Sequence, residues 1–61
     1  MSEHALVTEF LLAAEQGNAE ALAACLEKGV DINVTNRQKR TAIIIASLNK
    51  HYPCVELLIS A

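Results

Sequence analysis

Two stretches of the chain repeat one pattern at a spacing of 33 residues, and this repetition constrains the fold more than any other feature. Residues 8–28 and 41–61 align without a gap. Matching positions carry residues of the same kind: Thr8 with Thr41, Phe10 with Ile43, Leu11 and Leu12 with Ile44 and Ile45, Ala13 with Ala46, and Cys25 with Leu58. A fixed period of this length is typical of proteins built from stacked repeats. Such proteins usually present a binding surface rather than a catalytic pocket.

The composition limits how such repeats could pack. Of the 61 residues, 52% are apolar, and only two are aromatic. A chain of this length buries only about 60% of the surface that its unfolded form exposes, so it supports at most one small domain. We therefore expect a single module over residues 1–61, with repeat copy one at about 4–35 and an incomplete copy two at about 36–61. Its core should consist of Ala, Leu, Ile and Val on closely packed short helices.

Apolar residues recur at helical spacing in four segments. We expect helices in these segments: 3–16, 19–28, 42–49 and 53–60. Gly17 and Gly29 follow the first two segments and permit a left-handed backbone there. Asn18 and Thr41 are expected to cap the second and third helices, and Pro53 suits the first turn of the fourth. The chain is thus predicted to be all-α.

The segment between the two helix pairs, residues 30–40, has no helical period. Val30, Ile32 and Val34 alternate with polar residues, which predicts a short extended piece. Residues 36–40 then favour a turn, because Asn is a common turn residue. The expected arrangement is two antiparallel helix pairs joined by a protruding hairpin-like loop.

Charge is distributed unevenly along the chain. Residues 1–31 carry six acidic side chains and one Lys, whereas residues 32–61 carry four basic side chains and one Glu. This division could support contact between the halves or between chains, although solvated helix faces would give the same pattern.

Cys25 and Cys54 both fall on the apolar stripe of the repeat, where a thiol behaves as a small hydrophobic group. We expect both to be reduced and buried, and the protein therefore to be cytoplasmic. The N-terminal segment has no basic region and includes Glu3 and Glu9 in its apolar stretch, unlike a signal peptide. No apolar run approaches the roughly 18 residues of a transmembrane helix, so no membrane partner is expected.

The first copy resembles an ankyrin repeat in two runs, Leu12-Ala13-Ala14-Glu15-Gln16-Gly17-Asn18 and Leu26-Glu27-Lys28-Gly29-Val30-Asp31-Ile32-Asn33. The second copy opens with Thr41-Ala42-Ile43-Ile44-Ile45-Ala46, which resembles the Thr-Pro-Leu-His-x-Ala start of such a repeat. The resemblance covers about residues 6–61. It implies an ankyrin-type stack whose first copy is an N-terminal capping repeat, and a role in protein–protein interaction.

The second copy departs from the family pattern at several positions. Ala42 replaces the usual Pro, and Ile44 replaces a His whose polar contacts join the hairpin to the helices. Asn36 replaces an Asp, which is a mild change. Lys39 and Lys50 occupy positions where the family has Gly in a left-handed conformation, at a cost on the order of 1 kcal/mol each. We therefore expect copy two to be locally weak and held mainly by packing.

The resemblance implies that a partner binds at the hairpin tip and at the end of the first helix of each repeat. In this sequence those positions are Glu15, Gln16, Arg37, Gln38, Arg40, Leu48 and Asn49. The residue types agree in part, because Arg37, Lys39 and Arg40 put three positive charges on one turn and Arg can hold a carboxylate through two hydrogen bonds. The alternative is a solvated turn that only keeps the chain soluble.

The second copy is expected to leave a further apolar surface uncovered, since the family pattern continues with Gly beyond Ala61. Stacked repeats usually need about three units with polar outer caps. Either the chain is a fragment of a longer array, or its open end packs against another copy. We expect a truncated chain that forms a homo-oligomer when isolated, through these residues: Ile45, Leu48, Val55, Leu58 and Ile59.

Other functions find little support in the sequence. Three cations on an acidic chain without a nearby aromatic residue do not make a nucleic-acid surface. His51 and Cys54, with His4 and Cys25, lack the paired spacing of a zinc site and are interpreted as turn histidine and core cysteine. Neither cysteine has the setting of a nucleophile, and no phosphate-binding loop is present. We predict no catalytic, cofactor-binding or metal-binding residues.

We therefore predict a non-enzymatic module that binds an unidentified protein through its hairpin tip and inner helix face. The alternative is a structural cap that covers the core of a longer array or closes a homo-oligomer and has no separate ligand. A binding module should lose partner affinity when Arg37 or Arg40 is replaced by Ala. A cap should be indifferent to those changes but unfold on Leu58→Asp or Ile45→Asp, because an unpaired buried charge is costly.

Overall fold

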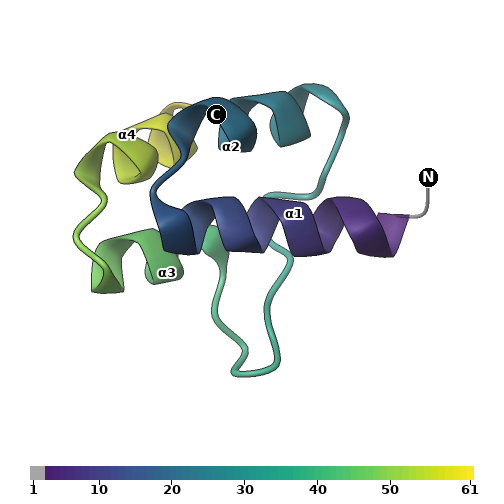
Figure 1. The fold of residues 1–61 in the computed structure, drawn as a ribbon, viewed down its shortest axis with the longest axis horizontal. Helices are drawn as coiled ribbons and strands as arrows, with labels where there is room; N and C mark the ends of the chain where they lie inside the picture. The colour runs from purple at the N-terminus through teal and green to yellow at the C-terminus, as the bar shows by residue number, and fades with distance from the viewer. Residues whose placement is uncertain (1–2) are drawn as a thin grey trace.

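The helices form two stacked pairs, and the structure, a computed structural model, describes residues 3–61. The chain folds into α1 (Glu3–Gln16), α2 (Ala19–Glu27), α3 (Ala42–Leu48) and α4 (Tyr52–Ser60). Both pairs are antiparallel, and they stack with α1 against α3 and α2 against α4 (Figure 1). Within the described residues, β-structure is limited to one bridge between Thr35 and Thr41, and no helix has the length and apolarity needed to cross a membrane. The predicted all-α class is confirmed, and each helix boundary lies within one residue of its expected place.

The same backbone hydrogen bond closes the turn in both helix pairs. In the first pair Asn18 N donates to Ala13 O at 2.9 Å, and in the second pair His51 N donates to Ala46 O at 2.8 Å. These two donors are 33 residues apart, as are the two acceptors. The sequence period is therefore also a period in hydrogen bonding.

The residue before each of these donors has a left-handed backbone, Gly17 with a φ of 75° and Lys50 with a φ of 59°. Glycine adopts this conformation without steric cost, whereas a residue with a side chain loses about 1–2 kcal/mol. Lys39 is also left-handed, with a φ of 62°. The expectation that both lysines occupy glycine-type positions is confirmed, and packing of the second pair must offset this strain.

The core lies between the four helices and consists mainly of small side chains. Phe10, Leu22 and Cys54 are the largest fully buried side chains. Four buried alanines of α1 and α3 belong to the same cluster: Ala13, Ala14, Ala42 and Ala46. Small side chains let helix backbones approach closely, which explains how short helices build a closed core. Cys25 and Cys54 are free and buried, as predicted.

The predicted extended piece at residues 30–34 is wrong, because this segment forms a turn. The Asp31 carboxylate oxygen Oδ1 accepts from Asn33 N at 2.9 Å, and Val34 N donates to Asp31 O at 3.2 Å. Val30, Ile32 and Val34 are half-buried against the core. Three apolar side chains held under a turn produce the same alternation in sequence as a strand.

The helix starts follow the predicted capping residues, with one difference. Asn18 caps α2, since its Oδ1 accepts from Ala21 N at 3.1 Å. Pro53 lies in the first turn of α4, as expected. Thr41 precedes α3, but its hydroxyl makes no capping hydrogen bond. Its carbonyl oxygen instead begins the helix by accepting from Ile45 N at 3.0 Å.

Candidate functional site

A hairpin (residues 35–41) projects from the helices on the side opposite α2 (Figure 1). An antiparallel bridge joins its first and last residues. Inside it, Asn36 N donates to Arg40 O at 3.0 Å. The Asn36 side-chain oxygen Oδ1 accepts from Gln38 N at 2.9 Å and from Arg40 N at 3.0 Å. One carboxamide therefore holds the turn, and the turn predicted at this place is confirmed.

Asn36→Ala is expected to lower the free energy of unfolding by about 1–3 kcal/mol, because two backbone donors lose their acceptor and each hydrogen bond contributes about 0.5–1.5 kcal/mol. Asn36→Asp keeps the acceptor oxygen and is the matched control, with little expected effect. Urea unfolding measures the stability, and hydrogen exchange at the Gln38 and Arg40 amides reports the turn itself. Equal losses in the two variants would show that this oxygen does not hold the turn.

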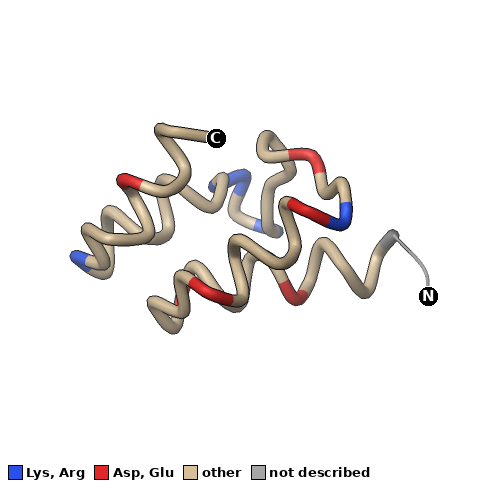
Figure 2. The backbone as a smooth tube through the Cα atoms, turned by 90° about the horizontal axis from the view of Figure 1, so that it is seen from above, with Lys and Arg blue, Asp and Glu red and all other residues tan. Residues whose placement is uncertain are grey.

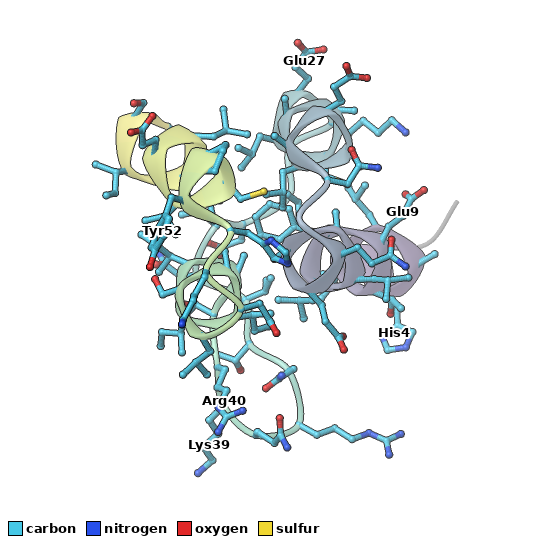
Figure 3. The ribbon with its side chains drawn as sticks, turned by 60° about the vertical axis from the view of Figure 1, so that its left-hand side comes forward. His4, Glu9, Glu27, Lys39, Arg40 and Tyr52 are labelled. Carbon is cyan, nitrogen blue, oxygen red and sulfur yellow. The ribbon has the colours of Figure 1, made fainter. Side chains whose placement is uncertain are left out.

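Three exposed cations, Arg37, Lys39 and Arg40, lie on the hairpin. Arg40 Nη1 donates a long hydrogen bond of 3.5 Å to Gln38 Oε1. Among the side chains that the structure describes, residues 4–61, no carboxylate lies within ion-pairing distance of the three cations. Lys39 and Arg40 extend from the end of the hairpin (Figure 3), and the hairpin contains no acidic residue (Figure 2). The hairpin is therefore a projecting group of unpaired positive charges.

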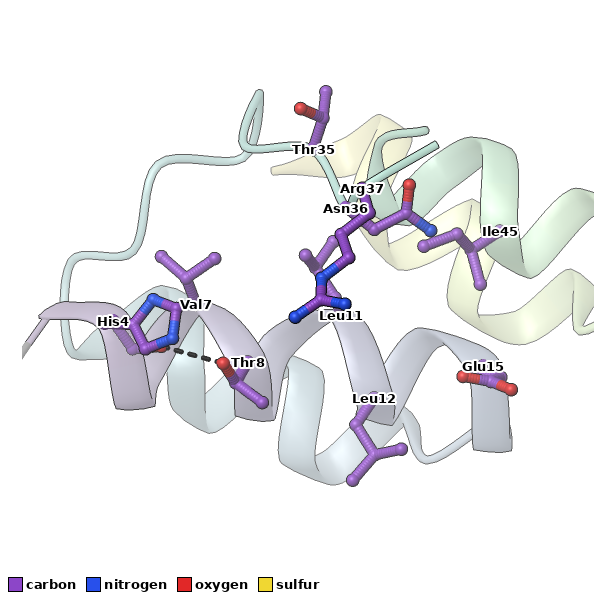
Figure 4. Close-up of a pocket in the computed structure, with 10 residues that line it drawn as sticks. All are labelled: His4, Val7, Thr8, Leu11, Leu12, Glu15, Thr35, Asn36, Arg37 and Ile45. Atoms are coloured by element: carbon purple, nitrogen blue, oxygen red, sulfur yellow. Dashed lines mark hydrogen bonds between the residues drawn. The ribbon is translucent and has the colours of Figure 1, made fainter. Parts of the chain in front are cut away.

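An open groove runs along α1 beside the hairpin (Figure 4). Its volume is about 640 Å³. Val7, Leu11 and Leu12 of α1 give it an apolar side, and Arg37 reaches into it from the hairpin. The other residues that line it are His4, Thr8, Glu15, Thr35, Asn36 and Ile45. An open surface groove of this kind suits an extended peptide better than a small molecule, which usually binds in an enclosing pocket.

The seven residues predicted to bind a partner lie at three places. Glu15 and Arg37 line the groove. Gln38 and Arg40 are exposed on the hairpin. The remaining three lie at helix ends outside the groove lining: Gln16, Leu48 and Asn49. The structure thus brings one α1 residue and one hairpin residue of the predicted set to a common surface.

Apart from Glu15, the residues of α1 that line the groove are not among the predicted site residues. Thr8, Leu11 and Leu12 line the groove there. Leu12 is the sequence feature that could have indicated this surface. It is apolar but lies off the buried stripe of α1, and it is 48% exposed. A large apolar side chain away from the buried stripe of a helix marks a surface patch that a partner can cover.

Two of the five residues predicted to form a self-association surface belong to the core of the chain itself. Ile45 is 7% exposed and Leu58 is 3% exposed, because α1 packs on α3 and α2 packs on α4. Val55 is half-buried. Leu48 and Ile59 are 60% and 68% exposed. Only Leu48 and Ile59 of this set present most of their side chains to solvent, so any such surface must be smaller than the sequence predicts.

His51 joins the two helix pairs. Its Nε2 lies 3.0 Å from the carbonyl oxygen of Glu15, near the end of α1. Its ring lies against Gly17, where an added Cβ would be 2.6 Å from Nδ1. His51 precedes α4, and Cys54 of that helix is fully buried. These positions agree with a turn histidine and a core cysteine.

Burial raises the pKa of the Cys54 thiol. Burial also raises the pKa of Cys25, with a smaller contribution from the Glu9 charge and an opposing one from Lys28. A raised pKa disfavours the thiolate, which is the form that attacks electrophiles and binds metals. Within the described part of the chain, no three His, Cys, Asp or Glu side chains are grouped so that they could hold a metal ion.

The repeat pattern is shared with known proteins. The family described as ankyrin repeats in many copies matches residues 10–59. A relative from Escherichia coli (strain K12), named as the ankyrin repeat protein YahD, is 49% identical over all 61 residues. The chain spans 30% of the length of that relative. Because the family match covers most of the chain, this protein belongs to the ankyrin repeat family, whose members are generally protein-interaction modules.

Proposed function

We propose that this chain is a non-enzymatic module that binds a protein partner through the hairpin and the adjoining groove on α1. The observation that carries the proposal is a hairpin whose turn is held by Asn36 Oδ1 directly beside an open groove. A surface that is ordered before binding loses less conformational entropy on association. Membership of the ankyrin repeat family supports the same role.

The predicted residues have distinct contact roles in the proposed complex. Arg37, Gln38 and Arg40 offer hydrogen-bond donors on the hairpin, and Glu15 offers an acceptor across the groove. Three further exposed residues extend the surface at the helix ends: Gln16, Leu48 and Asn49. No cofactor takes part in this binding. We also propose a cytoplasmic location, which the two free cysteines support.

Selection of a random peptide library on phage against the immobilised chain supplies binders while the natural partner is unidentified. We expect peptides whose affinity, measured by fluorescence anisotropy, falls about tenfold in Arg37→Ala and in Arg40→Ala, because each substitution removes a charge-assisted hydrogen bond. Lys28→Ala is the matched control, since Lys28 follows α2, away from the hairpin. Circular dichroism should be unchanged, because all three side chains are exposed.

Two outcomes would contradict the proposal. One is a selection that yields no peptide able to bind the folded chain. The other is a set of peptides whose affinity is the same for the wild-type chain, Arg37→Ala and Arg40→Ala, which would place binding elsewhere.

A second candidate function is structural, either self-association or the capping of a longer array through the outer side of α3 and α4. The exposed large apolar side chains on these two helices favour it: Ile44, Leu48, Tyr52 and Ile59. Covering such surface gains about 25 cal/mol per Å². Light scattering after size exclusion, over a concentration series and with circular dichroism, should then detect a dimer that Leu48→Ser and Ile59→Ser convert to monomer. A helical monomer at every concentration would contradict self-association.

A further inference from the structure

We propose that the groove on α1 takes an extended acidic segment of a partner protein, with one apolar side chain against Leu11 and Leu12 and an Asp or Glu carboxylate on Arg37. The inference rests on the proposed function and specifies the chemistry of the partner. It is carried by an unpaired Arg beside an apolar surface, by the positive charge of the hairpin, and by the position of Glu15 in the groove.

Arg37 is placed to receive a carboxylate. Its exposed side chain extends from the hairpin toward α1 (Figure 4). No acidic group in the described part of the chain pairs with it. A planar guanidinium binds a carboxylate through two parallel hydrogen bonds, which makes the contact stronger and more directional than one from Lys. A carboxylate of the partner therefore matches the unused donors of this side chain.

The α1 surface beside Arg37 is apolar. Leu12 is 48% exposed, and Val7 and Leu11 are half-buried. Ile45 of α3 contributes to the same lining. An apolar side chain of the partner that covers Leu12 gains about 25 cal/mol per Å². An Arg beside apolar surface that the partner covers is a common site of large binding contributions, because Arg is enriched among such residues and they lie in well-packed, desolvated parts of an interface. The partner segment should therefore carry an apolar residue close to its acidic residue.

The charges around the groove give the bound segment a direction. Lys39 and Arg40 add positive charge on the hairpin, whereas Glu15 lines the groove toward the end of α1 (Figure 4). A carboxylate beside Glu15 would be repelled. One near the hairpin would be attracted over a screening length of about 8–10 Å. The acidic residues of the partner should lie near the hairpin, with neutral or basic residues near Glu15.

A carboxylate-bearing peptide fits this surface better than nucleic acid does. The groove lining contains no Phe, Tyr or Trp on which a base could stack. Three of the five Lys and Arg residues of the chain lie on the hairpin, whereas α2 carries Glu20 and Glu27. Three charges on one turn can hold a short acidic segment but do not follow a long phosphate backbone.

The peptides selected from the random library test the inference. We expect them to share an Asp or Glu close to a large apolar residue. Synthetic copies with Asn or Gln in place of the acids should bind about tenfold more weakly. Raising the ionic strength should weaken the acidic peptides and leave their amide copies nearly unchanged. Leu12→Ser should weaken both kinds, because it removes the apolar contact that they share.

Lys39→Gly and Lys50→Gly form a matched pair of protein variants. Both lysines are exposed and left-handed, with φ of 62° and 59°. Each substitution removes one cation and relieves the same backbone strain, but only Lys39 lies on the hairpin. Lys39→Gly should weaken the acidic peptide severalfold, whereas Lys50→Gly should leave its affinity unchanged. Circular dichroism and urea unfolding establish that both variants are folded.

The possible failures are distinguishable. Groove-binding peptides that lose no affinity when their acids are replaced would overturn the acidic-partner inference and leave the proposed function standing. Peptides insensitive to both Arg37→Ala and Leu12→Ser, or a selection that yields none, would overturn both. A single-stranded oligodeoxythymidine that displaces the acidic peptide with equal affinity would overturn the choice of a protein segment in favour of nucleic acid.

Discussion

Replacing Phe10 by Ala is expected to unfold about half or more of the molecules at room temperature. Phe10 is 0% exposed and is the only Phe of the sequence. Truncation of a buried Phe costs about 3–5 kcal/mol, through lost contacts and the cavity that remains. A single core in a chain of this size rarely supplies more than about 3–5 kcal/mol of stability. The loss therefore matches the whole expected stability, and far-UV circular dichroism should show that about half or more of the helical signal is lost.

Leu12→Ala is the matched control for this substitution. Leu12 lies two positions along the same helix and is 48% exposed. Its truncation should change the free energy of unfolding by about 1 kcal/mol or less, because it leaves no cavity. A Phe10→Ala chain with a wild-type helical signal and an unchanged urea midpoint would contradict the central place of Phe10 in the core.

Gly17→Ala is expected to destabilise the chain by about 2–5 kcal/mol, from a left-handed backbone cost of about 1–2 kcal/mol and a steric conflict of about 1–3 kcal/mol. Gly17 has a φ of 75°, and an added Cβ would lie 2.6 Å from Nδ1 of His51. The ring cannot move away freely, since its Nε2 lies 3.0 Å from Glu15 O. Urea unfolding of the two chains measures the difference.

Gly29→Ala separates the two causes. Gly29 is also left-handed, with a φ of 91°, but an added Cβ there meets nothing within 4 Å. It should lose only the backbone cost of about 1–2 kcal/mol. His51→Ala should reduce the cost of Gly17→Ala in the double variant, because the conflicting ring is absent. Equal losses for Gly17→Ala and Gly29→Ala would rule out a steric role for His51.

The four helices are predictable from the sequence because their signals are local and occur twice. Asn18 caps α2 through its own side chain, and Gly17 ends α1 in a left-handed conformation. The period of 33 then assigns the same turn geometry to Lys50, a residue whose type alone does not suggest it. A repeated pattern thus compensates for a weak local signal in the second copy.

Burial and tertiary neighbours are less predictable, because they depend on which helices pack together. Ile45 and Leu58 belong to an apolar stripe that the sequence cannot divide into core and surface. The stacking of α1 on α3 and of α2 on α4 buries both. At residues 30–34 the alternation comes from side chains packed under a turn, and only the Asp31 hydrogen bonds distinguish that turn from a strand.

The candidate site also has features that the sequence predicts and features that depend on tertiary packing. The hairpin cations and the turn at Asn36 are visible in the sequence, because each depends on residues within one short segment. The groove requires that Arg37 and Leu12, which are far apart in the sequence, lie beside each other. That proximity comes from the position of the hairpin beside α1. The repeat pattern alone does not specify which exposed residues of α1 face the hairpin.

A nitrogen-15 NMR titration of the chain with a selected peptide tests most directly whether the hairpin and α1 form the binding surface. The proposed function predicts that amide shifts concentrate on residues 35–40 and on the Leu11, Leu12 and Glu15 side of α1. The amides of α2 should remain unperturbed, because α2 lies on the opposite side of the molecule (Figure 1). Shifts centred on α2 or α4 with an unperturbed hairpin would contradict the proposed binding surface.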